Sequence, residues 1–302
     1  MSARSVERPL IESYRTMSVS LKNSNTDATK QTGNWTEKVI RKPLARKTSP
    51  VDFVFYSLVN ISIIIPALNE ADQIFQSIER ARSTRPHEVI VIDGGSEDET
   101  ASIAENCDCR VLQSLPGRAV QQNLGASQAT GDVLLFLHAD CWLAKDALEQ
   151  IETALAEIQV VGGAFYQHIA ADGLVYRLLE AGNALRVRFL KIPFGDQGIF
   201  VRRSTFDELG GFPNVRLMED VLLMRKLRRR SRLVLLRGPL NVSARRWQRH
   251  GVIRQTARNW SLLMAQWIGV SPNRLADFYS NVRSPKSGVN QIEAENDGFS
   301  DS

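Results

Sequence analysis

The sequence predicts an α/β fold with a mainly parallel central sheet flanked by helices, and three observations favour it. From residue 61 onward, apolar runs of strand length alternate with stretches of helical spacing. Several of these runs end directly in polar or glycine-containing segments, as strands do before a crossover helix. The chain has 302 residues, of which 43% are hydrophobic, so it can bury a full core.

The first half of the expected domain is the more regular half. Ile61-Ser-Ile-Ile-Ile65 is predicted to be a buried strand that Pro66 stops. Ser96 or Asp98 can cap the helix that runs to about residue 105. The expected strands are 61–65, 88–92, 110–113 and 132–137, and the expected helices are 70–83, 96–105 and 117–129.

The second half follows the same alternation less clearly. Gly195-Asp-Gln-Gly198 and Gly210-Gly211 predict turns. We expect helices over 145–157, 174–185 and 253–268, a further helix opening at 218–220, and strands over 160–167, 199–202 and 233–236.

The two ends of the chain differ from this pattern. Residues 1–50 lack sustained apolar periodicity and carry ten Lys/Arg against four Asp/Glu. Such a segment cannot offset the entropy lost on ordering. We therefore expect a disordered basic tail over 1–55, one folded domain over 56–283 and a disordered tail over 284–302.

Charge and cysteine content indicate which binding partners and which cellular compartment fit the protein. The net charge is +5, and a basic stretch inside the domain, 221–250, holds ten Lys/Arg without an Asp or Glu. That stretch could cover phosphates or rest on an anionic membrane surface, and both interpretations stay open. Three cysteines argue against a disulfide framework, and no uninterrupted window of 18 apolar residues exists. We expect a cytoplasmic protein, with peripheral contact at the inner face of the membrane as an open hypothesis.

Polar residues directly follow three of the predicted strands, at Asn69-Glu70, Asp93 to Ser96, and His138-Ala-Asp140. Ligands bind beyond the carboxyl ends of parallel strands, so we expect these segments to meet at one crevice. Asp93 could accept hydrogen bonds from a base or ribose while Gly94 lets the ligand approach. The alternative is an ordinary glycine-rich turn in which Asp93 is a cap.

Carboxylates and arginines supply the chemistry expected at this crevice. Asp140 at a strand end suits a hard divalent cation, and the alternative is an exposed loop carboxylate. Glu219 and Asp220 open a helix, where the helix dipole alone would favour them. Arg245-Arg246-Trp247 joins guanidinium groups suited to phosphate oxygens to a stacking surface, and the alternative is a solvated basic face with a buried Trp.

Taken in order, these segments resemble family 2 glycosyltransferases with the GT-A fold, from Ile61 to about Asn281. The pieces are Ile-Ile-Ile-Pro66-Ala-Leu-Asn69-Glu70, Val-Ile-Val-Ile-Asp93-Gly-Gly-Ser96, Leu-Leu-Phe-Leu-His138-Ala-Asp140, Gly210-Gly-Phe212, Glu219-Asp220 and Arg245-Arg-Trp247. Three pieces are similar, more narrowly, to a bacterial subgroup labelled arsenosugar-biosynthesis glycosyltransferases: Pro116-Gly-Arg118-Ala-Val-Gln-Gln-Asn123, Leu137-His-Ala-Asp140 and Phe194-Gly-Asp-Gln-Gly198.

The resemblance implies an inverting, metal-dependent transfer of a sugar from a nucleoside-diphosphate sugar, most simply a UDP-sugar, to an acceptor hydroxyl. Asp140 would hold Mn²⁺ or Mg²⁺ against the diphosphate, and Asp220, beside Glu219, would be the general base. Asp196 and Trp247 would lie on the acceptor side. The implied nucleotide-sugar site consists of Pro66, Asn69, Glu70, Asp93, Gly94, Arg118, His138, Arg245 and Arg246.

Two positions depart from the family pattern. His138 stands where the acidic pair near the metal usually begins with Asp, and Ser243 stands where processive synthases carry Gln. We therefore expect a non-processive enzyme. A neutral His138 could still hydrogen-bond ribose or ligate a metal.

Two other classes of protein compete with this interpretation. A nucleotidyltransferase or a dinucleotide-dependent oxidoreductase would need a glycine-rich loop after the first strand, where this chain has Ala67-Leu-Asn-Glu70. A binding or scaffold protein that keeps the fold without the chemistry remains an alternative. No nucleic-acid partner is expected.

Overall fold

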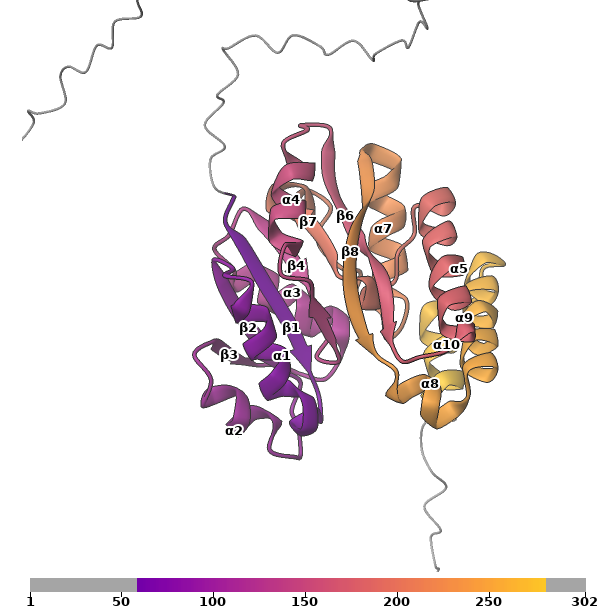
Figure 1. Ribbon diagram of the computed structural model, residues 1–302, viewed down its shortest axis with the longest axis horizontal. Coiled ribbons are helices and arrows are strands. Elements are labelled where there is room, and N and C mark those ends of the chain that lie inside the picture. Colours follow the sequence, from indigo (N-terminus) through magenta and orange to yellow (C-terminus); the bar gives the residue numbers. More distant parts are fainter. Residues whose placement is uncertain (1–58, 281–302) are drawn as a thin grey trace, which may run out of the picture. The chain divides into compact units, whose positions relative to one another are not determined.

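A computed structural model of the chain describes residues 59–280 and is built around an eight-stranded sheet (Figure 1). The strand order is β3-β2-β1-β4-β7-β6-β8-β5. The tails expected over 1–55 and 284–302 lie outside the described residues, as do the last residues of the expected domain.

One half of the sheet is parallel. Its strands are β1 (Ile61–Ala67), β2 (Glu88–Asp93), β3 (Arg110–Gln113) and β4 (Val133–Phe136). Every residue of β1 is buried, because helices cover both faces of the sheet and no polar alternation is needed. The carboxyl ends of β1, β2 and β4 therefore lie at one edge, as expected from the sequence.

The other half mixes directions. β7 runs antiparallel to β4 and β6, β6 runs parallel to β8, and the short β5 is antiparallel to β8. The bounds are β5 (Cys141–Leu143), β6 (Val160–Ala170), β7 (Ile199–Arg202) and β8 (Arg232–Ser243). The predicted mixed α/β class with a mostly parallel sheet is confirmed.

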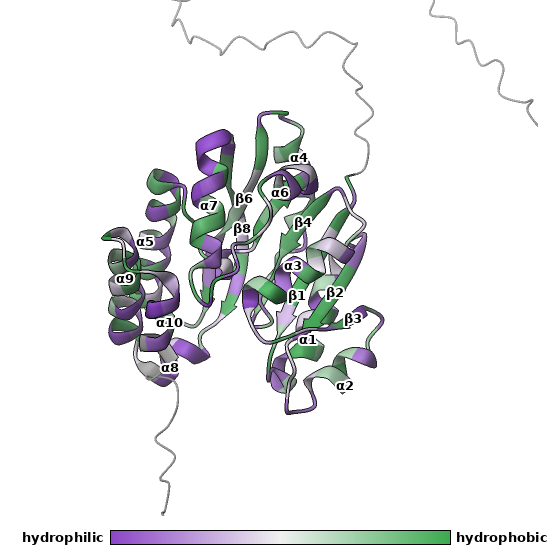
Figure 2. Cartoon of the chain, turned by 180° about the vertical axis from the view of Figure 1, so that it is seen from behind, coloured by the Kyte–Doolittle hydropathy of each residue, from purple (hydrophilic) through white to green (hydrophobic). Residues whose placement is uncertain are grey.

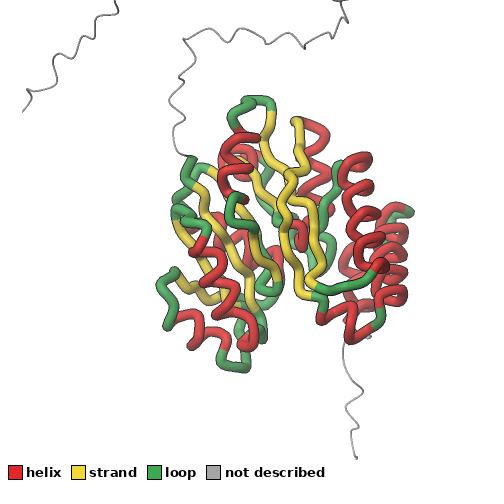
Figure 3. Tube along the Cα trace, viewed as in Figure 1, coloured by secondary structure: helices red, strands yellow, loops and turns green. Residues whose placement is uncertain are grey.

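Helices cover the two faces of the sheet (Figures 1 and 3). Apolar side chains of α1 (Ala71–Ser83), α2 (Thr100–Glu105) and α4 (Ala147–Leu155) share one core cluster with Ile61, Ile63 and Ile65 of β1. Those of α3 (Arg118–Gln128), α6 (Arg203–Glu208) and α7 (Glu219–Arg230) share another with Ile64. Successive side chains of β1 thus point to opposite faces of the sheet and contribute to both core clusters.

A group of helices lies beside the second half of the sheet (Figures 1 and 2). It consists of α5 (Leu174–Leu190), α8 (Arg245–His250), α9 (Val252–Trp267) and α10 (Pro272–Ser280). A small core of Val221, Leu262, Leu263 and Leu275 joins α9 and α10 to the start of α7. In the described part of the chain, none of the helices has the length and apolar content needed to cross a membrane.

Three local predictions were wrong. Pro66 does not stop the first strand, which continues to Ala67 with Pro66 opposite Ile92. The β1–β4 ladder ends at Ile64, so Pro66 has a paired strand on one side only, where a proline is tolerated. The helix expected from residue 96 begins at Thr100, so Ser96 is not its cap, whereas Asp98, the other expected cap, accepts from the Thr100 N–H at 3.0 Å.

The third error concerns β8, which was expected over four residues and has twelve. Arg237-Gly-Pro239 has the composition of a turn, but the strand passes through it opposite a register shift in β6. The expected basic helix is α7, whose Leu223, Met224 and Leu227 pack in the core under the sheet. Its apolar face is therefore not available to a membrane.

Candidate active site

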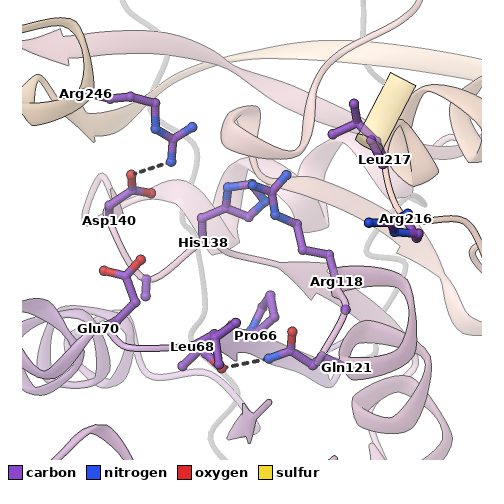
Figure 4. A pocket seen from close by; sticks show the side chains of 14 residues that line it. Pro66, Leu68, Glu70, Arg118, Gln121, His138, Asp140, Arg216, Leu217 and Arg246 are labelled. Atoms are coloured by element: carbon purple, nitrogen blue, oxygen red, sulfur yellow. Dashed lines mark hydrogen bonds and ion pairs between the residues drawn. The ribbon is translucent and has the colours of Figure 1, made fainter. Parts of the chain in front are cut away.

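A cavity of about 320 Å³ lies at the carboxyl ends of β1 and β4 (Figure 4). Its walls come from the β1–α1 loop, the start of α3, the turn after β4, the segment before α7, and α8. Of the predicted site residues, it brings together Pro66, Glu70, Arg118, His138, Asp140 and Arg246.

A second hollow of about 100 Å³ adjoins this cavity. The two share Arg118, His138, Leu217 and Arg246 as walls. The second hollow adds the predicted base Asp220 and the predicted acceptor-side Asp196. The two carboxylates Asp140 and Asp220, 80 residues apart in sequence, thus line adjoining spaces.

Asp140 sits in a tight turn between β4 and β5, where the Cys141 N–H donates to the His138 carbonyl at 3.0 Å. Arg246 donates to its Oδ2 at 3.3 Å, as drawn in Figure 4. Burial opposes ionisation of this carboxyl, but the charge of Arg246 holds its pKa below the ordinary value. Asp140 is therefore a paired carboxylate on the cavity wall.

The next arginine of α8 makes a second pair of the same kind. Arg245 lies 3.6 Å from a carboxylate oxygen of Glu70, which follows β1. Burial, and then the charge of Asp140, raises the pKa of Glu70. The consecutive arginines of α8 thus face two carboxylates at the sheet edge, where an anionic ligand could take over their hydrogen bonds.

His138 projects into the cavity beside Arg118 (Figure 4). Burial and then the charge of Arg118 lower the pKa of His138 to about 3, so the imidazole is neutral near pH 7. Donor atoms of His138, Asp140 and Cys141 lie within 4.8 Å of one another. Burial raises the pKa of the Cys141 thiol well above its ordinary value, so it stays protonated and donates to Asp140 Oδ1 at 3.5 Å.

These residues fit a hard divalent cation that takes only part of its ligands from the protein. One carboxylate and one neutral imidazole are available at the cavity wall, and a protonated thiol is a poor ligand. Phosphate oxygens and water would complete such a shell.

Asp220 begins α7 and is held by backbone groups on both oxygens. The Gly195 N–H donates to Oδ2 at 2.6 Å, and the Val221 N–H donates to Oδ1 at 2.7 Å. A Cβ on Gly195 would lie 2.7 Å from His138 Nε2 and 3.4 Å from Asp220 Oδ2. The absence of a side chain at Gly195 is what lets the imidazole approach the turn that carries Asp220.

Glu219 is buried behind this surface. Its Oε1 lies 3.9 Å from Arg118 Nη1, and burial, followed by the charge of Asp220, raises its pKa to about 7. Glu219 lines neither of the two hollows. It links α7 to the arginine that both hollows share.

Several predicted residues support the loops and do not line the cavity. Asp93 is 1% exposed and accepts hydrogen bonds from the Gly95 and Ser96 N–H groups, as its alternative interpretation as a turn cap describes. The Gly94 N–H donates to the Ala67 carbonyl, and Asn69 accepts from the Glu97 N–H. They join the loops that follow β1 and β2.

Trp247 is 6% exposed and belongs to the core cluster of α1 and α4. It also lines a hollow of about 20 Å³ that contains Asp196. The alternative interpretation, a basic face with a buried Trp, is therefore correct for the burial of Trp247.

Sequence reasoning missed several wall residues. Gln121 donates to the carbonyls of Ala67 and Ile92 at the base of the cavity, and it stands inside the Pro116–Asn123 segment singled out above. Arg216 and Leu217 precede the Glu-Asp pair directly. Asn259 of α9 lines the second hollow, and nothing in the surrounding sequence signals it.

Comparison with known proteins was made on sequence and on structure. The family described as Glycosyl transferase family 2 matches residues 62–211. Glycosyltransferase AglE of Haloferax volcanii is 26% identical over 170 residues, 51% of this chain and 56% of AglE. An uncharacterized glycosyltransferase of Haemophilus influenzae is 29% identical over 170 residues, 52% of this chain and 67% of the relative.

A solved structure of similar fold is the mannosyltransferase PcManGT from Pyrobaculum calidifontis in complex with GDP-Man and Mn²⁺. It has a TM-score of 0.51 and 20% identity, covering 76% of this chain and 65% of that one. The chain thus spans about half to two thirds of the length of the proteins described here.

Proposed function

Because the chain carries a glycosyltransferase family 2 domain and is a glycosyltransferase, we propose that it transfers a sugar from a nucleoside-diphosphate sugar to an acceptor hydroxyl. The observation that carries this is the pair of adjoining hollows, one with Asp140 and one with Asp220, that share two arginines and His138 as walls. A nucleoside-diphosphate sugar has a charged diphosphate, which needs cationic groups, and a reacting sugar carbon, which needs a base nearby. Two adjoining hollows can supply these different surroundings.

The larger cavity suits the diphosphate end of the donor. Arg118, Arg216 and Arg246 line it, and guanidinium groups bind phosphate oxygens in pairs of hydrogen bonds. A UDP-sugar remains our expectation for the donor. The GDP-mannose held by the mannosyltransferase of similar fold agrees with the nucleoside-diphosphate class.

Mn²⁺ or Mg²⁺ is the proposed cofactor, with Asp140 and His138 as its protein ligands. When bound, such an ion stabilises the negative charge that develops on a leaving diphosphate. The arginines shared by the two hollows act on the same charge from the protein side.

Asp220 is the proposed general base, and its place in the second hollow, beside the cavity proposed for the diphosphate, supports transfer with inversion. It would accept the proton of the acceptor hydroxyl while the oxygen bonds to the anomeric carbon from the face opposite the diphosphate. The Gly195 N–H holds its carboxylate in place for this task. Non-processive transfer is supported by Ser243, which stands where processive synthases carry Gln.

We also propose that the chain belongs to the arsenosugar-biosynthesis subgroup. Pro116–Asn123, Leu137–Asp140 and Phe194–Gly198, which carry this likeness, all contribute to the walls of the hollows. We further propose a cytoplasmic location with peripheral contact at the inner face of the membrane. Since the apolar side of α7 is buried, such contact would have to involve other helices.

Thermal unfolding with nucleoside diphosphates, with and without Mn²⁺, tests the proposal together with sugar-nucleotide hydrolysis. We expect one nucleoside diphosphate to raise the melting temperature in the presence of Mn²⁺, and the matching sugar nucleotide to be hydrolysed slowly. Stabilisation without any turnover would favour the binding or scaffold alternative. The lack of both would contradict the proposed donor.

A further inference from the structure

An apolar groove of about 460 Å³ runs between α5 and α9, outside the two hollows described above. Val175, Leu178 and Leu179 of α5 face Val252, Ile253 and Trp260 of α9 across it. The volume lies in the range of small-molecule sites. Figures 1 and 2 show the two helices side by side at the edge of the molecule, away from β3.

The large apolar side chains that line the groove have unusually high exposed fractions. Leu178 is 65% exposed, Ile253 82% and Trp260 44%. Further exposed residues continue the apolar surface along the same two helices, namely Leu174, Leu185, Phe189, Met264 and Trp267. Their helical spacing places them on the same faces as Leu178 and Trp260, and exposed apolar faces of this kind are typical of protein, membrane or ligand contacts.

The groove connects to the catalytic hollow through shared walls. Leu179, Asn183, Thr256 and Trp260 line both the groove and the hollow of about 20 Å³ beside Trp247. That small hollow in turn shares Phe194, Asp196 and Asn259 with the hollow of Asp220. Three hollows with shared wall residues thus adjoin one another between the surface and the proposed base.

Polarity changes along this path. The outer part is apolar, whereas Asn183, Thr256, Asn259 and Asp196 stand further in, before Asp220. Thr256 Oγ1 is buried and has no hydrogen-bond partner among the described residues. A buried hydroxyl of this kind is costly unless a ligand supplies the missing hydrogen bond.

We propose that the acceptor is a hydroxyl-bearing lipid whose hydrocarbon chain lies in the α5–α9 groove and whose hydroxyl reaches Asp220. This rests on the proposed function and names its acceptor class. In the transfer step the lipid oxygen bonds to the anomeric carbon, its proton passes to Asp220, and the nucleoside diphosphate leaves with the electrons of the broken bond.

The neighbouring hollows favour a lipid over other occupants of the groove. A protein partner or a second copy would cover the apolar surface but would leave the polar hollows between it and Asp220 without a role. A lipid with a hydroxyl accounts for both the apolar groove and the polar hollows beside it. Arg188 and Arg254 are exposed on the same two helices, and basic residues together with the exposed Trp260 and Trp267 are typical of surfaces that meet a lipid headgroup region.

A binding experiment with a fluorescent fatty acid tests the groove. The probe is 11-(dansylamino)undecanoic acid, and dansylglycine is its control because it keeps the fluorophore and carboxylate without the chain. Leu178→Gln/Ile253→Gln removes apolar surface from the groove, and Leu115→Gln/Ile158→Gln makes the same changes at residues 75% and 84% exposed elsewhere. Melting temperature with nucleoside diphosphate and Mn²⁺ is followed in all proteins.

We expect the unaltered chain to bind the long probe and not dansylglycine. The groove variant should bind it about tenfold more weakly or worse, because two apolar contacts are lost. The control variant should bind it normally, and the nucleotide response should be the same in all three. Equal probe binding in both variants, or none in the unaltered chain, overturns the groove assignment.

A transfer experiment tests the acceptor role. With a labelled sugar nucleotide and a bacterial total lipid extract, label should enter butanol-extractable material, about tenfold less in the groove variant and unchanged in the control. Turnover that gives water-soluble products alone overturns the lipid acceptor while leaving the glycosyltransferase proposal in place. Loss of the nucleotide response in the unaltered chain would instead contradict the proposed donor.

Discussion

At the scale of single residues, the site depends on how each titratable group is surrounded. His138 stands where the family usually has an acid. Its lowered pKa keeps the imidazole neutral, so a ring nitrogen could bind a metal ion beside Asp140. Asp220 is held by two backbone N–H groups, whereas Glu219 next to it is buried and has a raised pKa. Adjacent carboxyls in one sequence motif therefore have different properties, which the sequence alone did not distinguish.

Replacement of Asp220 by Asn should separate chemistry from binding. The variant keeps the shape of the side chain and loses the proton acceptor, so turnover should fall by about 10²–10⁴. The melting-temperature shift with nucleoside diphosphate and Mn²⁺ should be nearly unchanged. Asp207→Asn, at an exposed position of α6, is the matched control and should turn over normally. Normal turnover in Asp220→Asn would remove this residue from the role of base.

The raised pKa of Glu219 predicts a dependence of stability on pH. A carboxyl with a pKa of about 7 in the folded chain and an ordinary value of 4.5 is protonated more readily when folded. The stabilisation is complete below pH 4.5 and is lost as the pH rises through 7, by about 3 kcal/mol at most.

Glu219→Gln should abolish this loss, because the amide does not ionise. Urea unfolding at pH 5 and pH 8 measures it: the free energy of unfolding should fall less between the two values in the variant than in the unaltered chain. Identical falls would show that Glu219 ionises without cost in the folded protein.

At the scale of elements, the regular βα units could be predicted and the irregular ones could not. The predicted bounds of β3 and β7 agree with the structure, because each is a short apolar run between clear breaks. The predicted β8 ended before Gly238-Pro239, since the composition there favours a turn, whereas pairing with β6 and β5 keeps the strand extended.

Four elements, β5, α6, α8 and α10, were missed for reasons of length and context, and α6 has only six residues. β5 has three residues and exists through its pairing with β8, which is remote in sequence. α8 begins at the arginine pair, and six residues carry too little periodicity to be recognised. α10 did have a signal: Pro272 is its first residue, a favoured position for proline, and Leu275 and Ala276 form its buried side.

The contact between α3 and the sheet can be tested with a matched pair of glycines. A Cβ on Gly125 of α3 would lie 2.5 Å from Ile64 Cγ2 and 2.6 Å from Ile92 Cδ1. A Cβ on Gly182 of α5 would meet nothing within 4 Å. Both residues lie inside helices, so the same substitution gains the same helix propensity at both.

Gly125→Ala should destabilise the protein by about 1–2 kcal/mol, because overpacking exceeds the gain in propensity. Gly182→Ala should stabilise it by about 0.5–1 kcal/mol. Denaturant unfolding measures both. A stabilised Gly125→Ala variant would mean that α3 can move away from β1 and β2 without loss.

At the scale of the whole molecule, the site joins two halves with different character. The part that matches the glycosyltransferase family ends at residue 211 and supplies Asp140, His138 and Arg118. Asp220, Arg246 and the groove helix α9 come from the remainder. The sequence indicated the order of the motifs, but the meeting of both parts in adjoining hollows depends on the β7, β6 and β8 pairings, which only the folded chain reveals.

The ion pairs of α8 predict opposite effects on two ligands. Arg246→Gln leaves Asp140 without its guanidinium partner, so Mn²⁺ alone should bind several-fold more tightly, whereas nucleoside diphosphate should bind more weakly. Calorimetric titration measures both affinities. Arg249→Gln, an exposed arginine of the same helix, is the control and should change neither. A parallel change in both affinities would contradict this arrangement.

The pairing of Arg246 with Asp140 also has a consequence for how the protein fills its site. Before any ligand arrives, the arginine already balances the carboxylate, so neither a cation nor an anion finds an uncompensated charge at this pair. When both arrive, the arginine can turn to the phosphate and release the carboxylate to the ion. Each should therefore strengthen the binding of the other by the same factor, and the enzyme would admit its metal and its donor as a pair.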